Sequence, residues 1–199
     1  FSDGNFGIRS RFFRFQMRKY ASSIVTISLD NARRLGLEGK MKVVYNYTEM
    51  SGEAPKLASY SCKKFLYVGG ASYIKGFHIL VNSLEYLVQG ITVLFIGNYP
   101  VKKDNSFVIK VLQFVFYPRS FIRDKAIRKM RASPNAVEIG LVGDIRTYLD
   151  EVCCLVSPFV IPHFSRPIIE SYAYHKPVIA TNIQGMDEIV KNWETGILV

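Results

Sequence analysis

The feature that most limits the fold is a regular alternation of short apolar segments with longer helical ones, which begins at residue 64. We expect strands at residues 64–68, 91–96, 136–139, 152–156 and 177–181. Helices are expected at residues 75–88, 105–116, 120–131, 144–151, 167–174 and 185–191. Repeated strand–helix units of this length form parallel sheets through right-handed crossovers. The predicted fold class is therefore α/β, a Rossmann-like parallel sheet with helices on both faces.

A shorter stretch of the same kind precedes this one. Within it, residues 9–20 and 29–35 are predicted helices, and residues 23–28 and 42–45 are predicted strands. Residues 51–61 are rich in Ser, Gly, Pro and Ala, a composition typical of a linker. The predicted boundaries are a first unit at 1–50, a linker at 51–61 and a larger domain at 62–199.

Residues 157–190 carry the chemistry that is most specific in this chain. Pro167 suits the first turn of a helix, where its missing N–H has no cost. Glu170 follows early in that helix, close to the N–H groups that attract phosphate. Gly185 supplies a turn that can approach a ligand closely. A carboxylate for ribose hydroxyls beside amides for a diphosphate indicates a nucleotide-sugar site.

These residues resemble the donor-site signature of the family 4 retaining glycosyltransferases, also called group 1 glycosyl transferases. The matching positions are Pro167, Glu170, Lys176–Thr181, Gly185, Glu188–Val190 and Gly196–Val199. The resemblance continues upstream through Phe65–Gly69, Lys75–Gly76, Val93–Gly97 and Val137–Gly140. The resemblance covers roughly residues 62–199. Each matching motif alone is weak evidence, but all of them in this order are specific for the family.

The resemblance implies the GT-B architecture, in which two Rossmann-like domains hold the donor mainly on the C-terminal one. Residues 1–50 would then be the remnant of an N-terminal acceptor domain, because only about twenty residues precede its last strand–helix–strand segment. Residues 62–199 would be the nucleotide-sugar-binding domain, incomplete at its C-terminal end. We therefore expect a fragment or reduced version of a family member, which by itself can be inactive.

The activity implied is transfer of a hexose, with retention, from a UDP-, GDP- or ADP-sugar to a carbohydrate or lipid-linked acceptor, in glycan or glycolipid biosynthesis. Lys75 and His163 are the expected catalytic residues, Lys75 at the departing diphosphate and His163 at the sugar or phosphate. Glu170 would bind the ribose. The other expected donor-binding residues are Gly69, Gly70, Gly97, Phe164, Ser165, Arg166 and Gly185. The nucleotide sugar is a substrate, so we expect neither a cofactor nor a metal.

Two positions depart from the family's pattern. The family usually has Arg directly after the first Gly of the loop at 69–76, and this chain has Gly70. The family has two glutamates with seven residues between them; Glu170 matches the second, and the first falls on Pro162, which can neither act as a base nor accept from a sugar hydroxyl. Arg166 or Arg146 can replace the missing cation only if the fold brings them near the diphosphate.

The formal net charge of +10 calls for an anionic partner or ligand. Basic residues concentrate near the start, among three phenylalanines: Arg9, Arg11, Arg14, Arg18 and Lys19, with Phe12, Phe13 and Phe15. Two interpretations stay open, a basic amphipathic helix lying on an anionic membrane surface, or an ordinary helix with its aromatic rings packed inward. The basic residues are otherwise dispersed, so nucleic acid is not the expected partner.

The cysteines, Cys62, Cys153 and Cys154, lack metal-ligand spacing, and the adjacent pair is typical of a buried strand. A reducing cytoplasm is the expected location, with the enzyme either free there or peripheral on the membrane. Other functions stay open: a nucleotide-sugar epimerase or a phosphorylase of the same fold, or a non-catalytic basic binding module.

Overall fold

The structure is a computed structural model that describes residues 8–49, 61–100 and 118–199. The first stretch forms a small unit of α1 (Ile8–Tyr20), β1 (Ile24–Thr26), α2 (Leu29–Leu35), the 3-10 turn η1 (Glu38–Lys40) and β2 (Met41–Val43). The two strands pair in parallel, with Ile24 opposite Met41. Ser28 caps α2 by accepting from the N–H of Asn31 at 3.1 Å, and Gly36 ends the helix in the left-handed conformation, with φ 61°. We call residues 8–49 the N-terminal unit.

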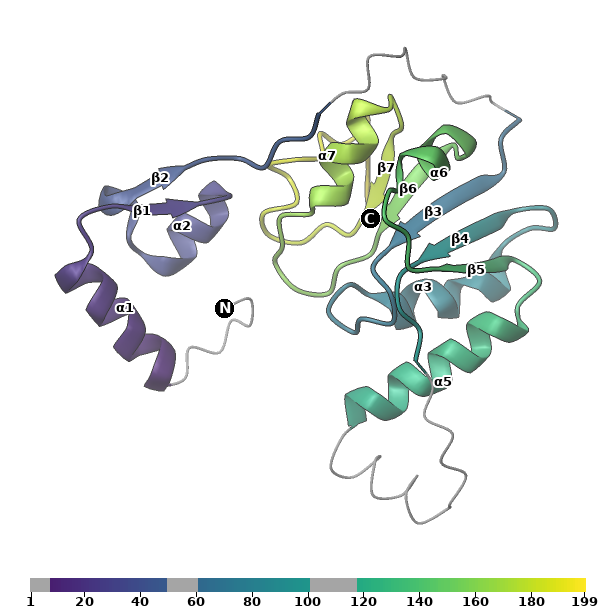
Figure 1. The fold of residues 1–199 in the computed structure, drawn as a ribbon, viewed down its shortest axis with the longest axis horizontal. Helices are drawn as coiled ribbons and strands as arrows, with labels where there is room; N and C mark the ends of the chain where they lie inside the picture. Colours follow the sequence, from purple (N-terminus) through teal and green to yellow (C-terminus); the bar gives the residue numbers. More distant parts are fainter. Residues whose placement is uncertain (1–7, 50–60, 101–117) are drawn as a thin grey trace.

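Residues 61–100 and 118–199 build a six-stranded parallel sheet in the order β5-β4-β3-β6-β7-β8 (Figure 1). Its strands are β3 (Lys64–Val68), β4 (Thr92–Ile96), β5 (Ala136–Gly140), β6 (Cys154–Ser157), β7 (Val178–Ala180) and β8 (Gly196–Leu198). Its helical segments are α3 (Phe77–Ser83), the 3-10 turn η2 (Leu84–Tyr86), α5 (Pro118–Ala132), α6 (Arg146–Glu151) and α7 (Arg166–Ala173). The predicted parallel sheet with helices on both faces is confirmed. We call this part the sheet domain.

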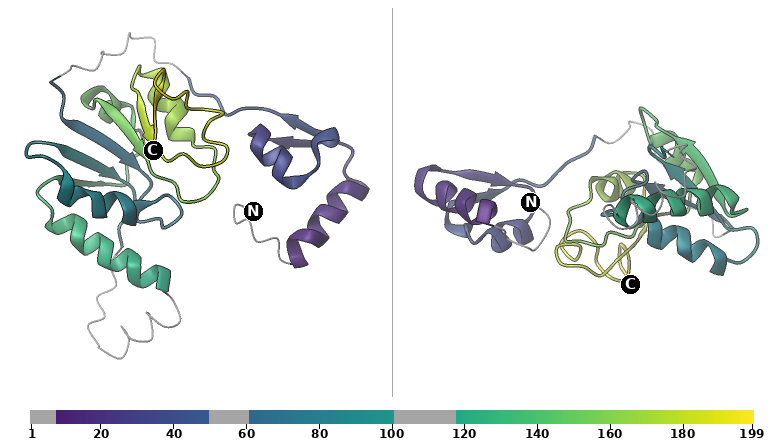
Figure 2. Two further views of the ribbon diagram at one scale, coloured as in Figure 1. Left: turned by 180° about the vertical axis from the view of Figure 1, so that it is seen from behind. Right: turned by 90° about the horizontal axis from the view of Figure 1, so that it is seen from below.

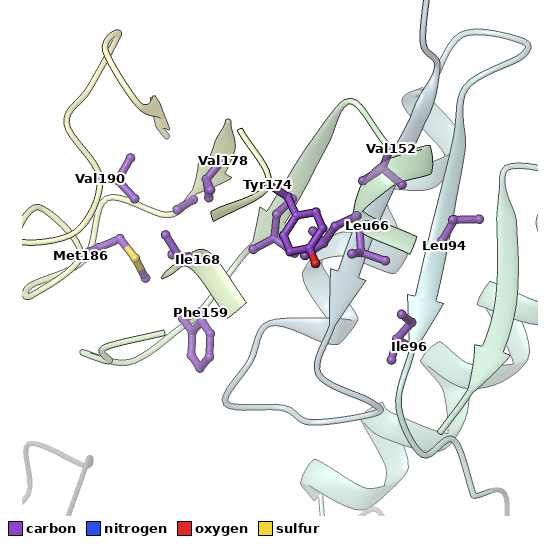
Figure 3. Packing of buried hydrophobic residues seen from close by; sticks show 13 residues of the cluster. Leu66, Leu94, Ile96, Val152, Phe159, Ile168, Tyr174, Val178, Met186 and Val190 are labelled. Carbon is purple, nitrogen blue, oxygen red and sulfur yellow. The ribbon is translucent and has the colours of Figure 1, made fainter. Parts of the chain in front are cut away.

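Alternate residues of each central strand enter two separate hydrophobic clusters, one on each face of the sheet. Leu66 lies in the first cluster and its neighbour Tyr67 in the second, as the two-residue period of a strand requires. The first cluster includes Ile168 of α7 and is shown in Figure 3. The second includes Phe77 of α3 and Ile127 of α5. All the described residues of both clusters belong to the sheet domain.

The strand order reverses at β3, which pairs with β4 on one side and with β6 on the other. The loops that leave the carboxyl ends of β3 and β6 therefore diverge from neighbouring points at one edge of the sheet. They are joined by a hydrogen bond from the N–H of Val160 to the carbonyl oxygen of Ile74, at 3.0 Å. Open parallel sheets bind ligands at such a switch point.

The structure differs from the sequence prediction at two places in the C-terminal part of the chain. The helix expected at 185–191 is instead a series of turns, in which Gly185 has a left-handed φ of 86° that a regular helix does not contain. The strand β8 was not predicted, because the short segment Gly196–Leu198 begins with a glycine, which weakens a strand pattern. The helix expected at 105–116 and nearly all of the linker at 51–61 fall outside the described residues.

In the described residues, none of the helices is both long and apolar enough to cross a membrane. The aromatic side chains of α1 are not packed inward: Phe12 is 61% exposed and Phe15 is 59% exposed. The interpretation of residues 9–20 as an ordinary helix with buried rings is therefore wrong for these two side chains. Figure 2 shows α1 on the N-terminal unit, away from the sheet domain.

Candidate functional site

A pocket of about 930 Å³ lies between the N-terminal unit and the sheet domain. The sheet domain contributes Gly143, Asp144, Ile145, Arg146, Arg166, Pro167, Glu170 and Tyr174. The N-terminal unit contributes Val25, Ile27 and the consecutive residues Val44–Glu49. The pocket thus combines the loop after β5, the start of α7 and the segment that follows β2.

Helix α7 supplies the two charged side chains of one wall. The helix begins at Arg166 and has Pro167 in its first turn, as predicted. Nε of Arg166 lies 2.9 Å from Oε1 of Glu170, one turn further on. The Arg166 side chain is 68% exposed and that of Glu170 only 20%, so the carboxylate is largely covered while the cation faces solvent. Arg166 and Glu170, both expected to bind the donor, therefore meet in one pocket.

The loop after β5 supplies a second ion pair. Nε of Arg146 lies 2.6 Å from Oδ2 of Asp144, and the backbone N–H of Arg146 donates to the same carboxylate at 2.9 Å. That backbone hydrogen bond is the main reason why the pKa of Asp144 is lowered. Arg146 was named with Arg166 as a substitute cation, and the fold does bring the two into the same pocket.

The N-terminal unit forms a wall that sequence reasoning missed. Tyr45 stacks on Phe164 with the ring centroids 5.6 Å apart and the planes at 26°. Phe164, expected to bind the donor, is buried and contacts the N-terminal unit. This contact joins residues 119 positions apart in the chain, and neither Tyr45 nor its neighbours carries a local motif that signals it.

A second group of cationic side chains gathers at His163. Burial lowers the pKa of His163, and the positive charges of Lys75 and Arg34 lower it further. The Phe159 ring stacks on the imidazole with centroids 4.2 Å apart. The lining of the pocket, taken over the described residues, includes neither Lys75 nor His163. Lys75 and His163, the two expected catalytic residues, thus interact electrostatically, and so does Arg34 of α2, which is itself paired with Asp30 at 2.6 Å and which the sequence did not indicate.

The glycines at the switch point pack backbone against backbone. Gly70 has φ 60°, and a Cβ there would lie 2.9 Å from N and from O of Asn98. The N–H groups of Gly69 and Gly70 donate to the carbonyl of Ile96 at 3.1 Å, and that of Gly97 donates to Gly140 at 2.8 Å. These N–H groups already donate to carbonyl oxygens of the protein itself. Their expected contact with a diphosphate therefore stays a prediction.

The remaining expected donor-binding residues lie close to the N-terminal unit or inside the sheet domain. Gly185 faces α2, where a Cβ would come within 3.1 Å of Oδ2 of Asp30. Ser165 is buried, and its hydroxyl accepts from Ser157 Oγ at 3.5 Å. Within residues 8–49, 61–100 and 118–199, three or more His, Cys, Asp or Glu side chains do not gather in a way that could hold a metal ion.

Comparisons with known proteins found one matching family model and several similar proteins. A family model described as "Glycosyl transferases group 1" matches residues 62–199. An uncharacterized 41.2 kDa protein in the cps region of Klebsiella pneumoniae is 25% identical over 169 residues, which are 81% of this chain and 42% of that protein. CapM of Staphylococcus aureus, a capsular polysaccharide biosynthesis glycosyltransferase, is 29% identical over 136 residues, 67% of this chain and 31% of CapM. The chain thus spans less than half the length of these curated relatives.

Solved structures share the fold. HepE of Anabaena, in complex with UDP and glucose, superposes with a TM-score of 0.72 at 19% identity, covering 95% of this chain and 52% of HepE. Sucrose-phosphate synthase of Thermosynechococcus elongatus gives a TM-score of 0.70 at 19% identity, covering 97% of this chain and 49% of that enzyme. The aligned regions cover 95% and 97% of this chain, which is more than residues 61–199 alone could supply. Both superpositions therefore include most of the N-terminal unit.

Proposed function

Because the chain belongs to the glycosyl transferases of group 1 and shares the GT-B fold of its structural neighbours, we propose that it moves a sugar from a nucleotide-sugar donor to an acceptor hydroxyl with retention. The observation that carries the proposal is the pocket in which Glu170 lies beside Arg166 and Arg146. A covered carboxylate suits ribose hydroxyls, and exposed guanidinium groups suit phosphate. The complex of HepE with UDP-glucose supports a UDP-sugar as donor.

In this proposal the nucleoside enters the pocket and Glu170 accepts hydrogen bonds from the ribose hydroxyls. The diphosphate extends from there toward Lys75 and His163, where cationic charge already gathers. Lys75 stabilises the negative charge that develops on the leaving diphosphate. The Lys75, Arg146 and Arg166 side chains supply the positive charge, so the proposed reaction needs no metal and no cofactor.

Retention is proposed to arise on one face of the sugar. An oxygen of the donor phosphate takes the proton of the acceptor hydroxyl as the bond to the diphosphate breaks. Such a reaction does not need the pair of spaced carboxylates that glycosidases use. Pro162, at the position of the family's first glutamate, is then compatible with transfer, and His163 supplies the nearby hydrogen-bond donor.

The proposed acceptor is a carbohydrate or lipid-linked glycan of the cell envelope. The cps-region protein and CapM, both similar to this chain, support that assignment. We propose a cytoplasmic location, where the free thiols of Cys62, Cys153 and Cys154 stay reduced. Contact with an anionic membrane through α1 is part of the proposal, because its exposed rings stand among basic side chains.

Calorimetry with nucleotides tests the donor assignment. UDP, GDP and ADP are titrated into the full chain, and the nucleotide that binds is then titrated into Glu170→Gln. We expect a loss of about 1–3 kcal/mol, since Gln keeps the shape of Glu but not the charge-assisted hydrogen bonds. Glu194→Gln, a change at an exposed residue outside the pocket, is the matched control and should bind normally. Equal affinity of Glu170→Gln and wild type would refute the ribose assignment.

A further inference from the structure

Glu188 joins the two parts of the molecule. The backbone N–H of Leu29 donates to Oε2 of Glu188 at 2.9 Å, and the N–H of Asp30 donates to Oε1. Tyr45 also meets this carboxylate: the pKa of its hydroxyl is raised by burial and then by the negative charge of Glu188 and a hydrogen bond to it. One side chain of the sheet domain thus contacts both α2 and the segment after β2.

The carboxylate fits the start of α2 for a physical reason. The first N–H groups of a helix lack partners inside the helix and carry partial positive charge. The side-chain hydroxyl of Ser28 satisfies the N–H of Asn31, at 3.1 Å. Glu188 satisfies the N–H groups of Leu29 and Asp30. The local cap and the distant carboxylate together complete the first turn of α2.

Two further contacts surround this one. Gly185 faces Asp30 so closely that a Cβ would lie 3.2 Å from its Cγ. The stacked rings of Tyr45 and Phe164 form the other contact, with centroids 5.6 Å apart. Helix α2 packs on β1 and β2, and β2 leads directly into Val44–Glu49, which line the pocket. Fixing α2 therefore fixes that wall of the pocket.

We propose that Glu188 is a positioning residue for donor binding: it fastens the start of α2 to the sheet domain and so holds Val44–Glu49 against Arg166 and Glu170. The proposal rests on the proposed function, because it concerns the same donor pocket. Glu188 is not among the residues that line the pocket in the described part of the chain, so it acts through the N-terminal unit. Donor in the pocket and the contact at α2 must then stabilise each other.

The test compares the full chain with Glu188→Gln and with the control Asp187→Asn, a change of the same kind at an exposed neighbour. Hydrogen exchange of the amides of Leu29 and Asp30 is measured with and without UDP, and UDP affinity is measured by calorimetry. In wild type and Asp187→Asn we expect UDP to slow exchange at these amides. In Glu188→Gln we expect faster exchange, little response to UDP and an affinity about 3–10-fold lower.

Each other outcome is decisive. Faster exchange in Glu188→Gln with unchanged UDP affinity would make Glu188 a structural contact alone and overturn the proposal. Unchanged exchange would show that the contact does not hold α2, and also overturn it. If wild type binds none of UDP, GDP and ADP, the proposed function fails and the positioning role falls with it. The ligand-free exchange data would still report whether Glu188 holds α2, so the two failures are distinguishable.

Discussion

At the scale of single residues, the protonation of His163 should affect stability at mildly acidic pH. Burial and the charges of Lys75 and Arg34 lower its pKa in the folded chain below the ordinary 6.5. As the pH falls below about 6.5, the unfolded chain takes up this proton first, so the free energy of unfolding decreases. We expect wild type to lose more stability than His163→Gln between pH 7.5 and 5.5 in urea denaturation.

Other titrating groups contribute equally to both proteins in this comparison, so the difference isolates His163. An identical pH dependence of wild type and His163→Gln would show that burial and the charges of Lys75 and Arg34 do not disfavour the protonated imidazole. Added UDP should reduce the difference, because a diphosphate near Lys75 and Arg34 offsets the charges that oppose protonation.

The backbone at Gly70 opposes replacing this glycine by the arginine that the family usually has at the same position. Its left-handed φ of 60° costs a residue with a Cβ about 1–2 kcal/mol, and the Cβ would also press on the Asn98 backbone at 2.9 Å. We expect Gly70→Arg to lower the free energy of unfolding by at least about 1–2 kcal/mol without tightening UDP binding. Gly39→Arg, at a site with open space and ordinary φ, should stay within about 0.5 kcal/mol of wild type.

A stable Gly70→Arg protein that binds UDP more tightly would contradict the backbone geometry of the loop at 69–76. The substitution also separates two roles of the same position. Loss of stability reports the close packing of Gly70 on Asn98, and nucleotide affinity reports the charge that arginine adds.

At the scale of elements, the sequence predicts the helices and strands that follow from local hydrophobic periodicity. It fails where contacts with distant segments determine the local structure. The strands at 64–68 and 136–139 were placed within one residue of β3 and β5, because each is an apolar run between turn signals. Residues 185–191 carry a helical pattern, yet they form turns in which Gly185 has a left-handed φ of 86° and faces Asp30 of α2. Helical spacing predicts that Arg166 and Glu170 lie in one pocket. The pocket wall at Val44–Glu49 could not be predicted in this way, because it depends on how the N-terminal unit meets the sheet domain.

Helix α1 is the element for which we expect a membrane partner. Its exposed Phe12 and Phe15 lie among arginines, a pattern that suits insertion of rings beside anionic headgroups. We expect the chain to sediment with vesicles that contain phosphatidylglycerol and not with pure phosphatidylcholine. Replacing both phenylalanines by Ser should abolish sedimentation, and Tyr86→Ser, at an 80% exposed ring of η2, should not.

Sedimentation that survives loss of both rings but disappears at high salt would assign the contact to charge alone, spread over the surface. Failure of wild type to bind either vesicle would remove the membrane from the proposed partners. In neither case does the donor pocket come into question, because α1 contributes none of its described lining residues.

At the scale of the whole molecule, stability and donor binding have different sources. Both hydrophobic clusters draw their buried residues from the sheet domain, between Leu66 and Val190. Of the sixteen described residues that line the pocket, the N-terminal unit supplies eight. The sheet domain should therefore fold by itself. It should still bind nucleotide, but only through the pocket residues that it supplies itself.

We expect a protein of residues 61–199 to unfold in one cooperative transition and to bind UDP about 3–10-fold more weakly than the full chain. That loss corresponds to roughly one neutral hydrogen bond, about 0.5–1.5 kcal/mol. Glu188→Gln in this shorter protein should then have no further effect on affinity, because the N–H groups it serves in α2 are gone. Calorimetry on the full chain and on residues 61–199, each with and without Glu188→Gln, forms a double-mutant cycle. If the two changes add fully instead, Glu188 meets the nucleotide by another route, and the N-terminal unit does not transmit its effect.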